Sequence, residues 1–124
     1  MAFDRSTVLS QWTMGGKLPK NYEGPEIFEL PVDGDPENTR WIVFAADGRY
    51  AVGKFDGKVF TPEHEGKHQL HHGSYYASQL FSNAPNGRKI QIGWAQIPMP
   101  GMPFIQTVSF PHELALRNTE DGFR

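Results

Sequence analysis

Three Asp-Gly or Asn-Gly dipeptides lie within about forty residues of this sequence, and each separates two short apolar segments. They are Asp47-Gly48, Asp56-Gly57 and Asn86-Gly87. Such residues tolerate the positive φ angles of a type I′ turn, whose twist matches the strands on either side. Each dipeptide therefore predicts a β-hairpin.

The apolar segments around these turns are short and rich in β-branched or aromatic residues, as expected of strands. From Glu26 onward they read EIFEL, RWIVFAA, RYAVGKF, KVF, SYYASQLF, RKIQIGWAQI, QTVSF and ELALR. Parallel strands need crossover connections of a dozen or more residues, and the sequence shows none. STVLSQW (6–12) can form at most one helical turn, because Gly15, Gly16 and Pro19 follow it. We therefore predict an all-β fold of antiparallel meanders.

Two polar stretches interrupt the apolar segments. Residues 31–39 are expected to be a turn-rich connection, with the turn at Gly34-Asp35-Pro36. Residues 61–73 are expected to separate two groups of strands, 24–60 and 74–117. Groups of this size are typical of β-propeller blades, while a small two-sheet β-sandwich needs the same number of strands and stays open. In either fold, Trp41, Phe44 and Phe55 are predicted core residues.

Charge and composition exclude several kinds of partner and cofactor. The 12 Lys and Arg nearly balance the 14 Asp and Glu, so no basic stripe is available and we expect no nucleic-acid partner. The longest apolar run, WIVFAA, is too short to span a bilayer, so no membrane association is expected. The N-terminus lacks the basic and apolar regions of an export signal, and the cellular compartment stays open. No glycine-rich phosphate-binding pattern precedes a helix and cysteine is absent, so no cofactor is predicted.

Four histidines lie within nine residues: His64, His68, His71 and His72. Imidazoles bind zinc or nickel well, but metal sites are usually held by a rigid frame with supporting hydrogen bonds. This segment has the composition of a loop, so we predict a solvated loop without a metal site.

Acidic residues near position 25 are candidates for proton transfer. Glu26 and Glu29 flank apolar residues, so at least one should lie on the wet face of a half-buried strand. Glu23 differs, because it stands between Tyr22 and a Gly-Pro step. Partial burial against Tyr22 would raise the pKa of the Glu23 carboxyl, as a general acid near neutral pH requires. From the residues alone, Glu23 is either such an acid or an ordinary surface carboxylate.

The order of four segments resembles the later part of the catalytic domain of glycoside hydrolase family 32. The segments are YEGPEIFELP, RWIVFAADGRYAVGKFDGKVFTPE, GSYYASQLFSNAPNGRKIQIGW and MPFIQTVSFPHELALR. This family contains levanases, inulinases and invertases, whose catalytic domain is a five-bladed β-propeller with a central active site. The resemblance implies that residues 1–124 are part of one propeller domain, with blade-like units at about 22–60 and 74–117.

By this resemblance, Glu23 matches the acid/base glutamate of the family's Glu-Cys-Pro-Asp motif. Tyr76, Gln79 and Trp94 match the Tyr-Ala-x-Gln and Gly-Trp motifs, which face or support the sugar pocket. The sequence departs from the family pattern at Gly24, Glu26, His71 and His112, where the family has Cys, Asp, Asp and Arg.

Two further family motifs are absent from these residues. The nucleophile lies in an Asn-Asp-Pro motif and a transition-state aspartate in an Arg-Asp-Pro motif, and neither occurs here. The resemblance therefore implies part of a β-fructosidase for fructans or sucrose that is inactive alone. The alternative is a noncatalytic module that binds carbohydrate through Trp41, Tyr75, Tyr76 and Trp94, or that forms a homo-oligomer through exposed strand edges.

Overall fold

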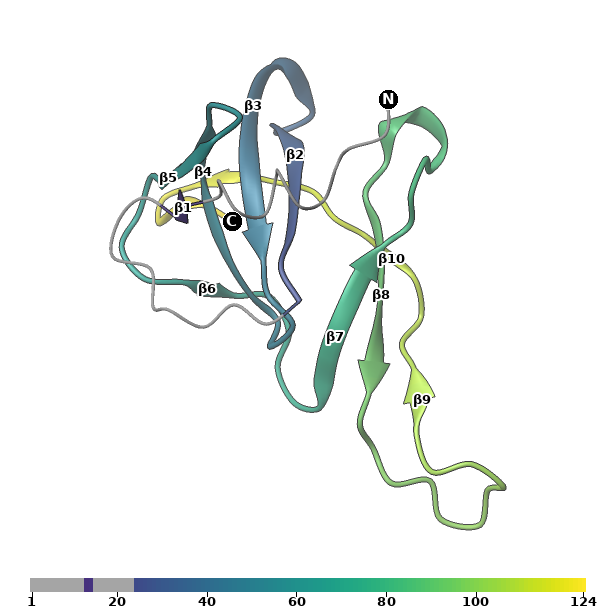
Figure 1. The fold of residues 1–124 in the computed structure, drawn as a ribbon. Coiled ribbons are helices and arrows are strands. Elements are labelled where there is room, and N and C mark those ends of the chain that lie inside the picture. The colour runs from purple at the N-terminus through teal and green to yellow at the C-terminus, as the bar shows by residue number, and fades with distance from the viewer. Residues whose placement is uncertain (1–12, 15–23) are drawn as a thin grey trace.

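Two largely antiparallel sheets make up most of the described chain (Figure 1). The computed structural model describes residues 13–14 and 24–124. The first sheet has the strand order β1-β5-β4-β3-β2, with β6 also paired to β4, and β1 runs parallel to β5. Its strands are β1 (Thr13–Met14), β2 (Glu26–Val32), β3 (Asp35–Phe44), β4 (Arg49–Phe55), β5 (Val59–Pro62) and β6 (His68–Gln69).

The second sheet has the order β10-β8-β7, with β9 paired to β8. Its strands are β7 (Tyr75–Leu80), β8 (Ile90–Ala95), β9 (Thr107–Val108) and β10 (His112–Glu113). A small hairpin of β11 (Asn118–Thr119) and β12 (Gly122–Phe123) ends the chain. Among the described residues there is one 3₁₀ turn, η1 (Pro85–Gly87), and no α-helix. None of these residues therefore lies in a helix long and apolar enough to cross a membrane. The possible turn at 6–12 lies outside the described residues.

All three hairpins predicted from Asx-Gly dipeptides are confirmed. Asp47-Gly48 connects β3 to β4, and Asp56-Gly57 connects β4 to β5. Asn86-Gly87 lies within η1, in the longer connection between β7 and β8. Asn86 and Gly87 both have positive φ, 60° and 69°. At Asp47-Gly48 and Asp56-Gly57 only the glycine has positive φ, 78° and 95°, so of these three dipeptides only Asn86-Gly87 has the two positive φ angles expected of a type I′ turn.

The predicted turn at Gly34-Asp35-Pro36 is wrong by two residues. The reversal is made by Asp33-Gly34, with φ of 53° and 82°, and Asp35 already begins β3. Residues 35–39, expected to be a connection, therefore belong to a strand. Pro36 is tolerated there because β3 pairs with β4 only from Trp41 to Phe44, so the missing N–H of Pro36 breaks no bond to β4.

Alternating side chains give the first sheet two apolar faces. One face carries Phe28, Leu30, Ile42, Phe44 and Val52, against which Leu116 packs. The opposite face carries a second cluster of Val43, Ala51 and Phe60, with Ile27, Trp41 and Phe55 packed against it.

The predicted core residues fall on both faces. Phe44 is fully buried, and Trp41 contacts Phe55 edge to face with ring centroids 5.2 Å apart. The core prediction is confirmed for Phe44, whereas Trp41 and Phe55 are only partly buried and pack against the edge of the second cluster. Glu29 is exposed on β2 and Glu26 is half-buried, which agrees with the expectation that at least one faces water.

Three hydrogen bonds donated by backbone N–H groups join the second sheet and the C-terminal segment to the first sheet. The N–H of Ala77 donates to the carbonyl of Ala46 at 2.9 Å, and the N–H of Leu80 donates to the Glu26 carboxylate at 3.0 Å. Residues after β10 then cross back over the first sheet, where the N–H of Asp33 donates to the carbonyl of Leu116 at 2.9 Å (Figure 1).

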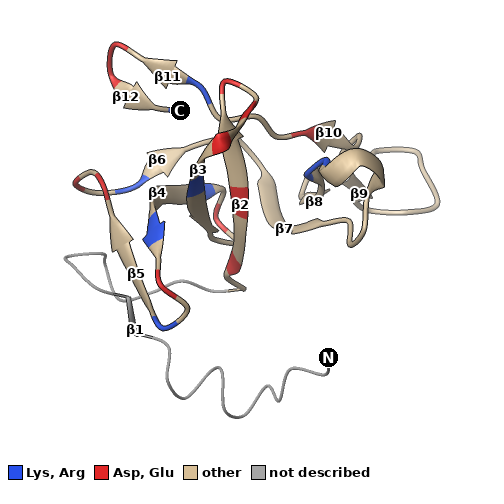
Figure 2. Ribbon diagram, turned by 90° about the horizontal axis from the view of Figure 1, so that it is seen from above, with Lys and Arg blue, Asp and Glu red and all other residues tan. Residues whose placement is uncertain are grey.

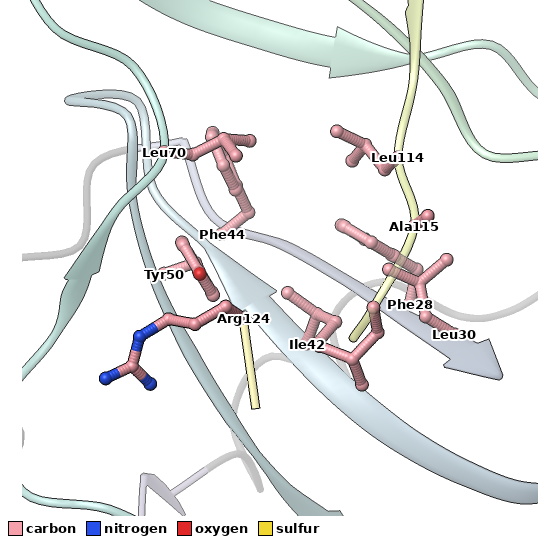
Figure 3. A pocket seen from close by; sticks show the side chains of 10 residues that line it. Phe28, Leu30, Ile42, Phe44, Tyr50, Leu70, Leu114, Ala115 and Arg124 are labelled. Carbon is pink, nitrogen blue, oxygen red and sulfur yellow. The ribbon is translucent and has the colours of Figure 1, made fainter. Parts of the chain in front are cut away.

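A small apolar cavity lies between the first sheet and this returning segment (Figure 3). Phe28, Ile42 and Phe44 line one side, and Leu114 and Leu116 come from the returning segment. Its volume is about 40 Å³, far below the roughly 300–1,000 Å³ of ligand pockets. The cavity is therefore a packing gap in the core and too small for a sugar.

Candidate functional site

A β-bulge in β7 decides which residues of the second sheet share a face. Tyr76 pairs with Trp94, and Gln79 pairs with Ile92, so two residues of β7 stand opposite the single residue Gly93. Without the bulge, residues three apart in a strand would point to opposite faces. The extra residue therefore brings Gln79 to the same face as Tyr76 and Trp94.

Small residues and a left-handed backbone make this bulge possible. Ala77 has a φ of 48°. Its N–H donates to the carbonyl of Ala46, in the turn between β3 and β4 of the first sheet. Opposite the bulge, a Cβ on Gly93 would overlap the ring of Tyr75. Glycine is thus required at position 93 because the Tyr75 ring lies directly over its backbone.

The three residues singled out by motif resemblance lie together on this face. Tyr76 and Trp94 meet edge to face, with ring centroids 6.5 Å apart, and 38 % of Trp94 is exposed. Val108 pairs with Trp94 from β9 and extends the same surface. We call Tyr76, Gln79, Ile92, Trp94 and Val108 the aromatic face.

A shallow hollow of about 490 Å³ adjoins the aromatic face. It is lined by Trp94, Phe104, Gln106, Thr107 and Val108. Strands β7, β8 and β9 contain no Lys, Arg, Asp or Glu, while charged residues gather on the first sheet and at turns (Figure 2). In the lining of the hollow, Trp94, Thr107 and Val108 lie on these uncharged strands, while Phe104 and Gln106 come from the connection before β9.

The other two aromatics proposed for a noncatalytic module point elsewhere. Tyr75 lies on the opposite face of the second sheet, stacked on His71 with ring centroids 3.8 Å apart. Trp41 packs against Phe55 on the first sheet. Neither lies on the aromatic face.

Glu23, the predicted acid/base residue, lies outside the described residues. The first acid after it is Glu26, at the start of β2. Burial raises the pKa of Glu26, and the hydrogen bond from the N–H of Leu80 partly opposes this shift. Both carboxylate oxygens of Glu26 accept this N–H, at 3.0 and 3.1 Å, so the side chain fixes the approach of β7 to β2.

The four neighbouring histidines separate into different environments. His64 stacks on His68, and its Nε2 accepts the N–H of Val52 at 2.9 Å. Nε2 of His68 accepts a hydrogen bond from Arg124 at 3.0 Å, while His72 is exposed. Burial, with smaller contributions from His64 and Arg124, lowers the pKa of His68 to about 4. In the described part of the chain, no three His, Cys, Asp or Glu side chains are grouped to hold a metal ion.

His71 instead joins a polar cluster on the inner face of the second sheet. Its Nε2 lies 3.2 Å from Oε1 of Gln91 and 3.1 Å from Nε2 of His112. No sequence pattern indicates this cluster, because Gln91 and His112 are far from His71 along the chain and share no motif with it.

Comparisons with known proteins agree with this architecture. The model of the glycosyl hydrolases family 32 N-terminal domain matches residues 3–123. The chain is 29 % identical to a levanase of Bacillus subtilis, with 96 % of this chain and 22 % of the levanase aligned. It is 31 % identical to an extracellular exo-inulinase of Meyerozyma guilliermondii, with 73 % and 21 % aligned.

A solved structure shows the same fold. The fructofuranosidase of Schwanniomyces occidentalis, complexed with fructose, matches with a TM-score of 0.70 and 25 % identity, over 83 % of this chain and 24 % of that one. These fructofuranosidases have a β-propeller N-terminal domain, which confirms the expected all-β propeller architecture. The chain spans about a fifth of the length of the curated relatives it matches. A family match over nearly the whole sequence shows that this chain belongs to glycosyl hydrolase family 32.

Proposed function

We propose that these residues are part of a β-fructosidase that hydrolyses fructans or sucrose, and that the aromatic face contributes to its sugar site. The observation that carries this proposal is the bulge, which gathers Tyr76, Gln79 and Trp94 on one face of strands without formal charge. Aromatic rings pack against the apolar faces of a neutral sugar, and an amide can hydrogen-bond its hydroxyls. The names of the relatives, a levanase and an exo-inulinase, point to the same substrate class.

The two sheets give the proposed blade-like units a physical basis. Units at about 22–60 and 74–117 correspond largely to the strands of the first and second sheets. Blades of a propeller pack face to face. Here two hydrogen bonds join the sheets, one from the N–H of Ala77 to the carbonyl of Ala46 and one from the N–H of Leu80 to the carboxylate of Glu26. We assign these sheets to two blades.

In this proposal Glu23 is the general acid/base, on the basis of its position in the motif. Its carboxyl donates a proton to the oxygen of the leaving sugar, and its carboxylate then activates water. A retaining glycosidase also needs a carboxylate nucleophile at about 5–5.5 Å from the acid/base. Since the Asn-Asp-Pro and Arg-Asp-Pro motifs are absent from the 124 residues, these residues alone are expected to be inactive.

A chimera tests the acid/base role in a complete site. The matching segment of the Bacillus subtilis levanase is replaced by residues 1–124, and release of fructose from levan is measured. The Glu23→Gln chimera should lose about 10²- to 10⁴-fold in kcat, as is typical when general acid/base catalysis is removed. Glu29→Gln is the matched control, since Glu29 is an exposed residue of the same segment. Equal activity of the Glu23→Gln chimera and its parent would rule out the role.

The isolated chain tests the dependence on other segments. Purified residues 1–124 should release no fructose from sucrose, inulin or levan. Fructose release that disappears in Glu23→Gln would contradict the proposed inactivity.

A second candidate function is a self-associating, noncatalytic module. The connection between β8 and β9 and the segment after it expose several large apolar side chains, including Ile105 (81 % exposed) and Phe110 (92 % exposed). Exposed apolar surface favours association where such side chains are contiguous. Light scattering of the isolated chain should then show oligomers that the double variant Ile105→Ser, Phe110→Ser converts to monomers; a monomeric parent at high concentration would remove this candidate.

A further inference from the structure

Three side-chain atoms converge on one point between the two sheets. Nε2 of His71 and Nε2 of His112 are 3.1 Å apart, and each lies 3.2 Å from Oε1 of Gln91. The three atoms thus form a nearly equilateral triangle.

The fold holds each corner of this triangle by a different element. Gln91 and His112 are direct partners in the β8–β10 ladder, so their side chains share a face. His71 precedes β7, and its ring is stacked on Tyr75 and meets Phe44 edge to face. The side chains are therefore positioned by strand register and ring packing together.

Hydrogen bonding alone fits this cluster poorly. Three groups that can donate a hydrogen bond lie around Oε1 of Gln91: the imidazoles of His71 and His112, and the hydroxyl of Tyr75 at 3.3 Å. An amide oxygen has only two lone pairs, so it has one potential donor more than it can accept from. Nε2 of Gln91 has no partner, and the residue is 0 % exposed. Rotating the amide by 180° exchanges the two atoms and leaves the buried oxygen without a partner.

The triangle matches one face of a metal coordination shell. Metal–nitrogen and metal–oxygen bonds of roughly 2.0–2.2 Å with angles between 90° and 109° separate neighbouring donor atoms by about 2.8–3.6 Å. The separations here, 3.1 and 3.2 Å, lie within that range. Imidazole nitrogens with an amide oxygen are a donor set for late first-row divalent ions.

We propose that His71, Gln91 and His112 bind a divalent transition metal ion of the zinc type. Gln91 is buried, while His71, His112 and Tyr75 are partly exposed, so an ion enters from the imidazole side and water completes its coordination. The donor set is neutral, which makes binding weaker than at a structural zinc site with thiolate ligands.

The bound ion would connect two strands of the second sheet to the segment that precedes it. It joins the segment before β7 to β8 and β10, on the side opposite the aromatic face. The site is independent of the proposed hydrolase activity, because none of its three ligands lies on the aromatic face or is the proposed acid/base residue.

Calorimetric titration of the full 124-residue chain with Zn²⁺, after removal of metal with a chelator, tests the proposal. One ion should bind per chain and raise the unfolding temperature, because an ion that binds only the folded state stabilises it. His71→Phe and His112→Phe keep a ring for the contacts with Tyr75 but remove both nitrogens. Each should weaken Zn²⁺ binding by more than the roughly 10-fold loss that follows removal of a group supporting a ligand.

His72→Phe is the matched control, because His72 is an exposed neighbour outside the triangle, and it should bind Zn²⁺ like the parent. Absence of binding in the parent chain, or unchanged binding in both His71→Phe and His112→Phe, would overturn the proposal. If a variant does not fold, nitrogen-15 NMR of the parent decides. Zn²⁺ should shift Nε2 of His71 and His112 and not that of His72, and the opposite pattern would place any bound ion on the surface histidines instead.

Discussion

Trp94 lies directly across from Tyr76 in the β7–β8 ladder, with ring planes at 68°. Gln79 reaches the same face only through the bulge at Ala77 and Ser78. The arrangement of the aromatic face therefore depends on the backbone of two small residues as much as on contacts between the rings.

The bulge should tolerate glycine at position 77 and reject a β-branched residue. The φ of Ala77 is 48°, and a left-handed backbone costs a side-chain-bearing residue about 1–2 kcal/mol. Ala77→Val should lower the free energy of unfolding by a further 1–3 kcal/mol or so. In Ala77→Gly, release of strain offsets the added chain entropy, so the change should stay within about 0.5 kcal/mol. Urea denaturation measures both; a valine variant as stable as the glycine variant would contradict the strained bulge.

A methyl group at position 93 should destabilise the fold because it would overlap the ring of Tyr75. A Cβ on Gly93 overlaps Tyr75, and inserting atoms into a packed site typically costs about 1–3 kcal/mol. Gly93→Ala should therefore reduce stability strongly in the parent and much less in a Tyr75→Ala background. A double-mutant cycle gives the coupling directly. Additive effects of the two substitutions would show that the overlap with Tyr75 is not the cause.

His68 should make the folded state less stable at mildly acidic pH. Its folded pKa is lowered to about 4, chiefly by burial, from an ordinary value of 6.5. The unfolded state therefore takes up a proton first as the pH falls, so the contribution of neutral His68 is complete above pH 6.5 and declines towards pH 4. Urea denaturation between pH 7.5 and 4.5 should show this decline, and His68→Asn should reduce its slope. An identical slope in the variant would assign the decline to other groups.

Glu26 should make the folded state less stable as the pH rises, opposite to the effect of His68. Burial raises its folded pKa above the ordinary value of 4.5, so its contribution is complete below pH 4.5 and is lost as the pH rises through the folded pKa. Glu26→Gln retains an oxygen for the N–H of Leu80 and removes the charge, so it should stabilise the fold at pH 7. Glu26→Ala removes the acceptor and should cost about 1–3 kcal/mol. Thermal unfolding at pH 7 compares the two, and equal losses would mean that the charge itself is needed.

The hairpins could be predicted because Asn, Asp and Gly tolerate the positive φ angles that a tight hairpin turn needs. Asp33-Gly34 has the same Asx-Gly chemistry and makes the turn, whereas Pro36, which suggests a turn, is acceptable in a strand that lacks a neighbour on one side. Sequence motif order also identified Tyr76, Gln79 and Trp94, which the structure brings to one face.

The rest of the site depends on relationships that have no local sequence pattern. The sequence around Ala77 does not predict a left-handed backbone there, because this conformation accompanies a hydrogen bond from the N–H of Ala77 to the carbonyl of the distant Ala46. The meeting of His71 with His112 joins residues 41 positions apart, and it follows from the β8–β10 register. The histidine-rich segment suggested that neighbours in sequence would act together, whereas the fold separates them.

The return of Leu116 to the first sheet affects how the chain can fold during synthesis. Leu116 forms a bridge to Val32 and accepts the N–H of Asp33, and its side chain is buried in the core of that sheet. The apolar face carrying Phe28 and Ile42 is therefore incomplete until Leu116 has left the ribosome. Contacts between such distant residues slow folding, and the nascent first sheet would expose this face to chaperones until Leu116 arrives.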